Sequence, residues 1–147
     1  MNATKKEKFT RVQRDSSECN FIDTKGKLLS EQWFVWVFNF KDEFALVERE
    51  NHEYNYIDKK GKLLLNEWFK SVGRFYNGFA IVQRENHQYN FIDKHGKIIS
   101  EQWFKSVDYF NKDGLARVQR KDSKYNFINK DGKIISDEWF YSVEDFR

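Results

Sequence analysis

The sequence contains no proline and a single cysteine, Cys19, among its 147 residues. Without proline, reversals of the chain depend on glycine, asparagine and aspartate. One cysteine excludes an intramolecular disulfide. Cys19 also stands where the related segments described below carry tyrosine. We therefore expect a small buried apolar side chain there and not a reactive thiol.

Long apolar runs are also missing from the sequence. No stretch approaches the roughly 18 apolar residues of a membrane-spanning helix. The first residues, Met-Asn-Ala-Thr-Lys-Lys, lack the apolar region of a signal peptide. The sequence therefore predicts a cytoplasmic protein that does not enter a membrane.

The net charge is small, because 26 Lys and Arg nearly balance 23 Asp and Glu to leave +3. This balance gives no strong preference for nucleic acids or anionic membranes. Aromatic residues, by contrast, make up 18% of the chain, which is enough apolar surface to build a core and to exclude disorder.

One segment occurs four times: it begins with Asn-Phe/Tyr-Ile, continues through Gly-Lys and ends with Trp-Phe. The copies begin at Asn20, Asn55, Asn90 and Asn126, so they are 35, 35 and 36 residues apart. A fixed period of this size is typical of repeat proteins. We expect a single domain at 8–147 after a disordered tail at 1–7. The predicted repeats are 8–40, 43–75, 78–110 and 114–146.

The third repeat shows the pattern inside a unit. In residues 79–84, positions that stay small or apolar in all repeats alternate with a position that varies. This alternation predicts a strand with Ala80 and Val82 inward and Ile81 toward solvent. Residues 89–93 predict a second strand, joined to the first by a short polar hairpin loop. A glycine turn then leads to a third predicted strand at 97–100, followed by an irregular fourth segment that begins at Trp103.

The core is predicted at positions that hardly change between repeats. The turn glycines belong to the same set, because a tight turn needs a residue that adopts positive φ. The asparagines that open each segment are polar residues within apolar strands, so they are expected to hydrogen-bond backbone between repeats. The predicted structural positions are Val12, Val47, Val82, Val118, Ile22, Ile57, Ile92, Ile128, Trp33, Trp68, Trp103, Trp139, Phe34, Phe69, Phe104, Phe140, Gly26, Gly61, Gly96 and Gly132.

Two stretches, Phe-Ile-Asp-Lys-x-Gly-Lys at 91–97 and Phe-Ala-Ile-Val at 79–82, resemble the WG-containing repeats of bacteria and phages. The Trp-Gly pair that names the family is replaced by Tyr89-Asn90 and its counterparts. The resemblance covers residues 8–146 and implies a β-rich interaction scaffold of bacterial or phage origin, without an established chemistry.

The predicted fold is therefore all-β. We expect four tandem antiparallel units of about 35 residues, stacked as an open repeat array. Stacking is expected because one unit cannot bury its own tryptophan and phenylalanines, whereas neighbouring units cover each other's apolar faces. A small four-bladed β-propeller is the alternative arrangement.

Charged rows recur with the repeat. Each unit's first strand ends with an arginine: Arg14, Arg49, Arg84 and Arg120. They either bind an anionic polymer or have a structural role, stacked on a neighbouring aromatic ring or paired with Asp23, Asp58 or Asp93. The second interpretation is favoured, because an invariant repeat position is usually structural. The lysines after the turn glycines suggest nucleic-acid binding. A parallel row of glutamates and the low net charge disfavour it: Glu31, Glu67, Glu101 and Glu138.

No catalytic constellation is visible, since nearly every polar residue has counterparts in the other repeats. His52 and His87 lack the converging ligands that a metal requires. We therefore predict a non-enzymatic protein without metal or cofactor.

The predicted function is protein–protein interaction or scaffolding through repeat-variable positions, with self-association through the terminal repeats near Phe9 and Phe146. Carbohydrate binding on aromatic faces is the alternative, and nucleic-acid binding comes third. Trp36 is singled out because the other repeats carry serine there. The candidate contact residues are Trp36, Val35, Arg11, Leu46, Ile81, Arg117, His52 and His87, together with the hairpin tips at 15–17, 50–52, 85–87 and 121–123.

Overall fold

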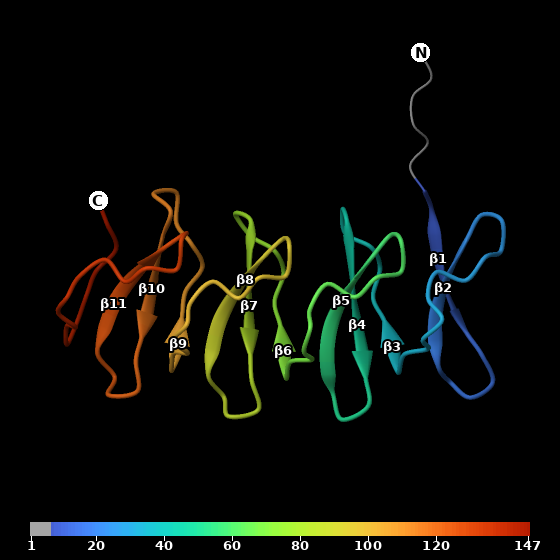
Figure 1. The fold of residues 1–147 in the computed structure, drawn as a ribbon, viewed down its shortest axis with the longest axis horizontal. Helices are drawn as coiled ribbons and strands as arrows, with labels where there is room; N and C mark the ends of the chain where they lie inside the picture. Colours follow the sequence, from blue (N-terminus) through green and yellow to red (C-terminus); the bar gives the residue numbers. More distant parts are fainter. Residues whose placement is uncertain (1–6) are drawn as a thin grey trace, which may run out of the picture. The chain divides into compact units, whose positions relative to one another are not determined.

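The computed structural model describes residues 7–147, which form eleven β-strands and no helix (Figure 1). Within this range no helix that could cross a membrane is found. The predicted tail at 1–7 lies outside the described residues except for Glu7, which is exposed.

All strand pairs are antiparallel. The first sheet has two strands, and each of the other three sheets places a two-residue strand beside a hairpin. The strands are β1 (Phe9–Gln13) with β2 (Cys19–Asp23); β3 (Trp36–Val37), β4 (Phe44–Arg49) and β5 (Glu53–Asp58); β6 (Ser71–Val72), β7 (Phe79–Gln83) and β8 (Tyr89–Asp93); and β9 (Ser106–Val107), β10 (Leu115–Gln119) and β11 (Tyr125–Asn129). The predicted hairpins and the all-β tandem antiparallel fold are thus confirmed.

The structural sheet is offset from the sequence repeat. The short strand of each three-stranded sheet comes from the end of the preceding repeat. For example, Val107 of β9 is paired with Val118 of β10, and Val37 of β3 is paired with Val47 of β4. Each repeat therefore contributes its last segment to the sheet of the next one, which links consecutive repeats by backbone hydrogen bonds.

The prediction of a third strand at 97–100 is wrong. After the turn only a single bridge joins Ile98 to Ile92, and the Ile99 N–H donates to the carbonyl of Phe91. The side chain of Asn90 then takes the next pairing position, because its Nδ2 donates to the Ser100 carbonyl at 2.8 Å. A side-chain amide replaces the backbone partner here, so the segment does not continue as a strand.

The turn that precedes this segment is held by an aspartate. Oδ1 of Asp93 accepts hydrogen bonds from the backbone N–H groups of His95 and Lys97 at 2.8 and 3.0 Å. Gly96 follows the pattern with φ 81°. At the equivalent Asp23, the N–H donors of Lys27 and Lys25 stabilise the charged carboxylate and lower its pKa.

The chain divides into two compact units, residues 1–68 and 69–147. Each unit has its own apolar cluster, the first around Phe34, Val47 and Ile57. The second lies around Phe104 and Ile128. Within each unit, a repeat packs on the one that follows it.

Nine of the sixteen predicted core positions that are not glycine are buried, with informative exceptions. The first repeat's Val12 and Ile22 and the four tryptophans are half-buried. Phe140, in the last repeat, is 37% exposed, whereas its counterpart Phe104 is fully buried. The buried members of the predicted set are Val47, Val82, Val118, Ile57, Ile92, Ile128, Phe34, Phe69 and Phe104.

Candidate interaction surface

The four repeated arginines stack on the four repeated tryptophans. The guanidinium carbon lies 4.2 Å from the Trp33 ring centroid in Arg14 and 4.6 Å from the Trp68 centroid in Arg49. The corresponding distances are 3.9 Å for Arg84 over Trp103 and 4.8 Å for Arg120 over Trp139. Cations held over an aromatic face gain stabilisation from the ring quadrupole. The predicted stacking is confirmed, so these arginines have a structural task.

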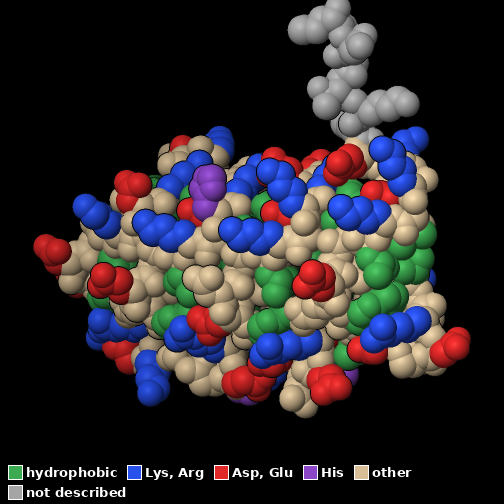
Figure 2. Space-filling model, turned by 45° about the vertical axis from the view of Figure 1, so that its right-hand side comes forward, with side chains coloured by type: hydrophobic (Ala, Val, Ile, Leu, Met, Phe, Trp, Pro, Cys, Tyr) green, Lys and Arg blue, Asp and Glu red, His purple; other side chains and the backbone are tan. Residues whose placement is uncertain are grey.

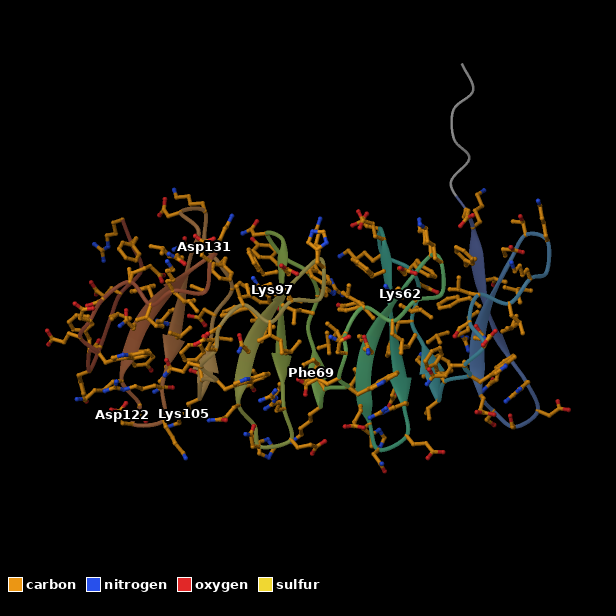
Figure 3. All side chains as sticks on the ribbon, viewed as in Figure 1. Lys62, Phe69, Lys97, Lys105, Asp122 and Asp131 are labelled. Carbon is orange, nitrogen blue, oxygen red and sulfur yellow. The ribbon has the colours of Figure 1, made fainter. Side chains whose placement is uncertain are left out.

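The tryptophans of the second, third and fourth repeats also contact a phenylalanine of the preceding repeat. The centroids of Phe34 and Trp68 are 6.2 Å apart, and so are those of Phe69 and Trp103. Phe69, labelled in Figure 3, is almost completely buried. The order phenylalanine, tryptophan, arginine therefore forms a stack that joins one repeat to the next.

We expect Arg84→Ala to lower the free energy of unfolding by about 1–2 kcal/mol, because it removes a cation and its stem from the Trp103 face. Urea denaturation followed by tryptophan fluorescence measures this change. Lys94→Ala, at an exposed position of the same repeat, serves as control with an expected change below about 0.5 kcal/mol. Equal effects of the two substitutions on the free energy of unfolding would contradict the claim that the arginine stabilises the fold.

The repeated asparagines are buried and bonded within their own repeat. Oδ1 of Asn90 accepts from the Phe91 N–H at 2.7 Å, and its Nδ2 donates to Ser100 and Gln102 carbonyls. The prediction that these side chains hydrogen-bond backbone is correct, but the partners lie ten and twelve residues ahead and not in a neighbouring repeat. Every buried side-chain nitrogen or oxygen among the described residues has a partner.

The two candidate histidines lie at exposed hairpin tips with different partners. Nδ1 of His52 is 2.9 Å from a carboxylate oxygen of Glu48. His87 faces the Lys70 ammonium, with Nδ1 2.9 Å from Nζ. Residues 7–147 contain no group of three or more His, Cys, Asp and Glu side chains placed to hold a metal ion.

Basic side chains do not gather into one patch on the visible face. Figure 2 shows Lys and Arg side chains interspersed with Asp and Glu. Lys62 and Lys97, which follow turn glycines and are labelled in Figure 3, are exposed. On the face that Figure 2 shows, this mixed arrangement offers no continuous cationic track for a nucleic-acid backbone.

The predicted solvent-facing strand positions differ between repeats. Arg11 is exposed, whereas Leu46 and Ile81 are half-buried. Ile81 packs against the core cluster of its unit. Arg117 pairs with Asp108, with Nη2 2.6 Å from Oδ2. The prediction that this strand position is open to solvent is therefore met at Arg11 but not at Leu46, Ile81 and Arg117, which are half-buried.

The segment that ends the first repeat carries an unusual exposed apolar group. Val35 and Phe38 are 44% and 43% exposed, and Trp36 lies half-buried between them with Arg11 4.1 Å above its ring. The corresponding segments read Lys-Ser-Val-Gly, Lys-Ser-Val-Asp and Tyr-Ser-Val-Glu. We call Val35, Trp36 and Phe38 the apolar edge. The predicted exposure of Trp36 is only partial, because Arg11 covers one face.

A second aromatic group was missed by the sequence analysis. Tyr76 and Tyr109 are 58% and 46% exposed, and their rings meet edge-on with centroids 5.4 Å apart. Tyr109 crosses Gly73, where a Cβ would lie 3.6 Å from the tyrosine hydroxyl. The available signal was that all three positions vary between repeats, but their proximity could not be inferred from spacing.

Comparison with known families matches the WG containing repeat at residues 56–86 and 91–125. Over these two stretches the chain is similar to the WG containing repeat family. Each matched WG repeat begins in the second strand of one hairpin and extends into the hairpin of the next repeat, which agrees with the offset between sequence and sheet. The predicted resemblance is confirmed over these two stretches. Comparison with curated proteins gives no match.

Several solved structures show partial similarity to this chain. The structure of BamB from Moraxella catarrhalis has 11% identity and a TM-score of 0.43, covering 87% of this chain and 44% of that one. The computationally designed Ika4 protein has 14% identity and a TM-score of 0.42, and the match covers 82% of this chain and 84% of that one. HIRA(644-1017) has 8% identity and a TM-score of 0.42, covering 90% and 53%.

Proposed function

We propose that this protein is a non-catalytic repeat module that binds another protein through the apolar edge formed by Val35, Trp36 and Phe38. The observation that carries the proposal is the exposure of Val35 and Phe38, at 44% and 43%, where the other repeats place lysine or tyrosine and glycine or an acidic residue, respectively. Aromatic side chains at a partly exposed site are typical anchors of protein interfaces.

The invariant residues support a scaffold role for the rest of the repeat. The arginines are stacked on tryptophans and the asparagines are committed to internal hydrogen bonds. Residues with fixed internal partners are poorly placed to select a ligand, whereas variable positions distinguish partners in repeat proteins. The cytoplasmic location and the bacterial or phage origin stay predictions.

The test replaces the apolar edge with the residues that another repeat uses at the same place. The variant Val35→Lys/Trp36→Ser/Phe38→Asp reproduces the Lys-Ser-Val-Asp of residues 105–108, so its backbone has a native precedent. A partner captured from native lysate, in the presence of nuclease and competing sugars, is purified and titrated against both proteins. We expect the variant to bind it roughly thirty-fold more weakly or worse.

The matched control is the double variant Tyr76→Ala/Tyr109→Ala, which removes exposed aromatics from the other compact unit. This control should bind the protein partner as the wild type does. Unchanged affinity in the apolar-edge variant would contradict the proposal, provided that its circular dichroism and urea midpoint show a folded protein.

Carbohydrate binding is the second candidate, and the exposed pair Tyr76 and Tyr109 favours it. Pyranose rings present apolar faces that stack on exposed aromatic side chains, in the same way as other flat or apolar groups. If the protein binds carbohydrate, the tyrosine variant becomes the test and the apolar-edge variant becomes the control. The tyrosine variant loses retention on a polysaccharide column, and the apolar-edge variant keeps it.

A further inference from the structure

The contact between consecutive repeats follows one recurring pattern. A phenylalanine of one repeat lies against the tryptophan of the next. The ring centroids are 6.2 Å apart for Phe34 and Trp68, and 6.5 Å apart for Phe104 and Trp139. Phe34 and Phe104 are 2% and 0% exposed in consequence. The pattern buries one face of each repeat with the opposite face of its successor.

A second contact accompanies the aromatic pair. The turn glycine of one repeat lies against the carbonyl of the preceding repeat, Gly61 at Leu29 and Gly132 at Ile99. A Cβ at Gly61 would overlap the Leu29 carbonyl oxygen and come within 3.1 Å of its carbon. The close approach therefore depends on glycine, since any larger residue would separate the repeats.

In the last repeat, the half of this contact that carries the phenylalanine is exposed. Phe140, the counterpart of Phe34 and Phe104, is 37% exposed. Ile135, the counterpart of Leu29 and Ile99, is 47% exposed, and Phe146 is 49% exposed. We call Ile135, Phe140 and Phe146 the tail face.

The first repeat presents the complementary half. A Cβ at Gly26 would meet no atom within 4 Å, and Leu28 is 43% exposed whereas its counterparts are half-buried. Trp33 is half-buried, and among residues 7–147 its ring is contacted by the Arg14 guanidinium, 4.2 Å from the centroid. We call Gly26, Leu28 and Trp33 the head face.

Charge also matches between the two faces. Lys25 and Lys27 flank Gly26, and Asp137 and Glu138 follow Ile135 closely; all four side chains are exposed. Opposite charges near two apolar faces favour their approach and disfavour contact between two like faces.

We propose that this chain associates head to tail, with the head face of one copy docking on the tail face of a second copy in the contact that joins consecutive repeats. Trp33 then covers the partner copy's phenylalanine, and Gly26 lies against the carbonyl of the second copy's Ile135. Such an interface is heterologous, so it generates chains or rings instead of a two-fold dimer. It uses residues other than the apolar edge, and it stands or falls separately from the proposed function.

The experiment measures molar mass by sedimentation velocity and light scattering from micromolar to millimolar concentration. Wild type should form oligomers as concentration rises, either an open series or a ring of fixed size. Gly26→Ala blocks the head face, and Phe140→Asp places a charge in the tail face. Each variant alone should remain monomeric over the range where wild type assembles, with association weakened roughly thirty-fold or more.

Mixing the two variants gives the deciding result. Gly26→Ala retains an intact tail and Phe140→Asp retains an intact head, so the mixture should form a one-to-one dimer and nothing larger. Failure of the mixture to dimerise, where wild type assembles, would overturn the head-to-tail arrangement. A wild type that stays monomeric throughout would overturn the proposal itself.

Two controls separate docking from folding. Gly78→Ala also introduces a Cβ at positive φ, 90°, with no atom within 4 Å, but it lies on neither face and should assemble as wild type. If Gly26→Ala does not fold, Leu28→Glu tests the head face at an exposed side chain. Loss of assembly in Gly78→Ala would show that backbone strain, and not a blocked face, causes the effect, which would contradict the assignment of Gly26.

Discussion

Gly132→Ala should destabilise the second compact unit by about 4 kcal/mol or more. The φ of Gly132 is +84°, which costs an L-residue about 1–2 kcal/mol. In addition, the new Cβ would overlap the carbonyl oxygen of Ile99 and lie 2.8 Å from its carbon. A backbone carbonyl cannot rotate away as a side chain can, so two repeats would have to separate, with loss of the packing between them.

Gly78→Ala provides a matched comparison in the same unit. Its φ is 90° and a Cβ would meet nothing within 4 Å, so only the backbone term of about 1 kcal/mol remains. Urea denaturation monitored by circular dichroism at low protein concentration compares the midpoints of the two variants. Similar midpoints would contradict the view that close approach between repeats, and not only the turn conformation, fixes glycine at position 132.

The turn glycines show how far the sequence could be interpreted. Their positive φ was predictable, because Asp-x-x-Gly at the end of a strand is a turn signal with a known conformational reason. The contact of Gly61 with Leu29 was not predictable from the sequence, because it depends on how closely two consecutive repeats approach each other. Period and composition indicate that repeats stack, but they do not give the spacing at which they stack.

The hairpins followed from alternation, whereas the segment after the turn did not. Residues 97–100 have the β-branched composition of a strand, and composition predicted one. The structure instead gives the hydrogen bonds to the Asn90 side chain. Competition between a side-chain amide and a backbone partner is decided by local geometry, which residue type alone does not determine.

The candidate surfaces could likewise be predicted from the sequence only in part. Comparison of repeats identified Val35 and Trp36 as variable, and the structure shows Val35 exposed. Comparison of the repeats could not show that Arg11 lies over Trp36, because the two residues belong to different sheets. The Tyr76 and Tyr109 pair escaped notice because its members occupy different positions within their repeats. Variation between repeats was visible in the sequence, but proximity required the fold.

Asn90→Ala should lower the free energy of unfolding by about 3–4 kcal/mol. Asn90 is fully buried; Nδ2 donates to the Ser100 carbonyl at 2.8 Å and Oδ1 accepts from the Phe91 N–H at 2.7 Å. Alanine would leave these backbone groups buried without partners, and each unsatisfied group costs about 1–3 kcal/mol. The cavity left by the amide adds a further loss that the alanine methyl does not fill.

Asn66→Ala is the control, because Asn66 is exposed and its removal should change stability by less than about 0.5 kcal/mol. Amide hydrogen exchange gives the more specific measurement, since the N–H groups of Phe91 and Ser100 lose their shared acceptor. These two amides should lose protection before the β7–β8 hairpin amides do. Retention of their protection in Asn90→Ala would mean that water or a shifted backbone replaces the amide, and that the asparagine is not what ends the strand at the turn.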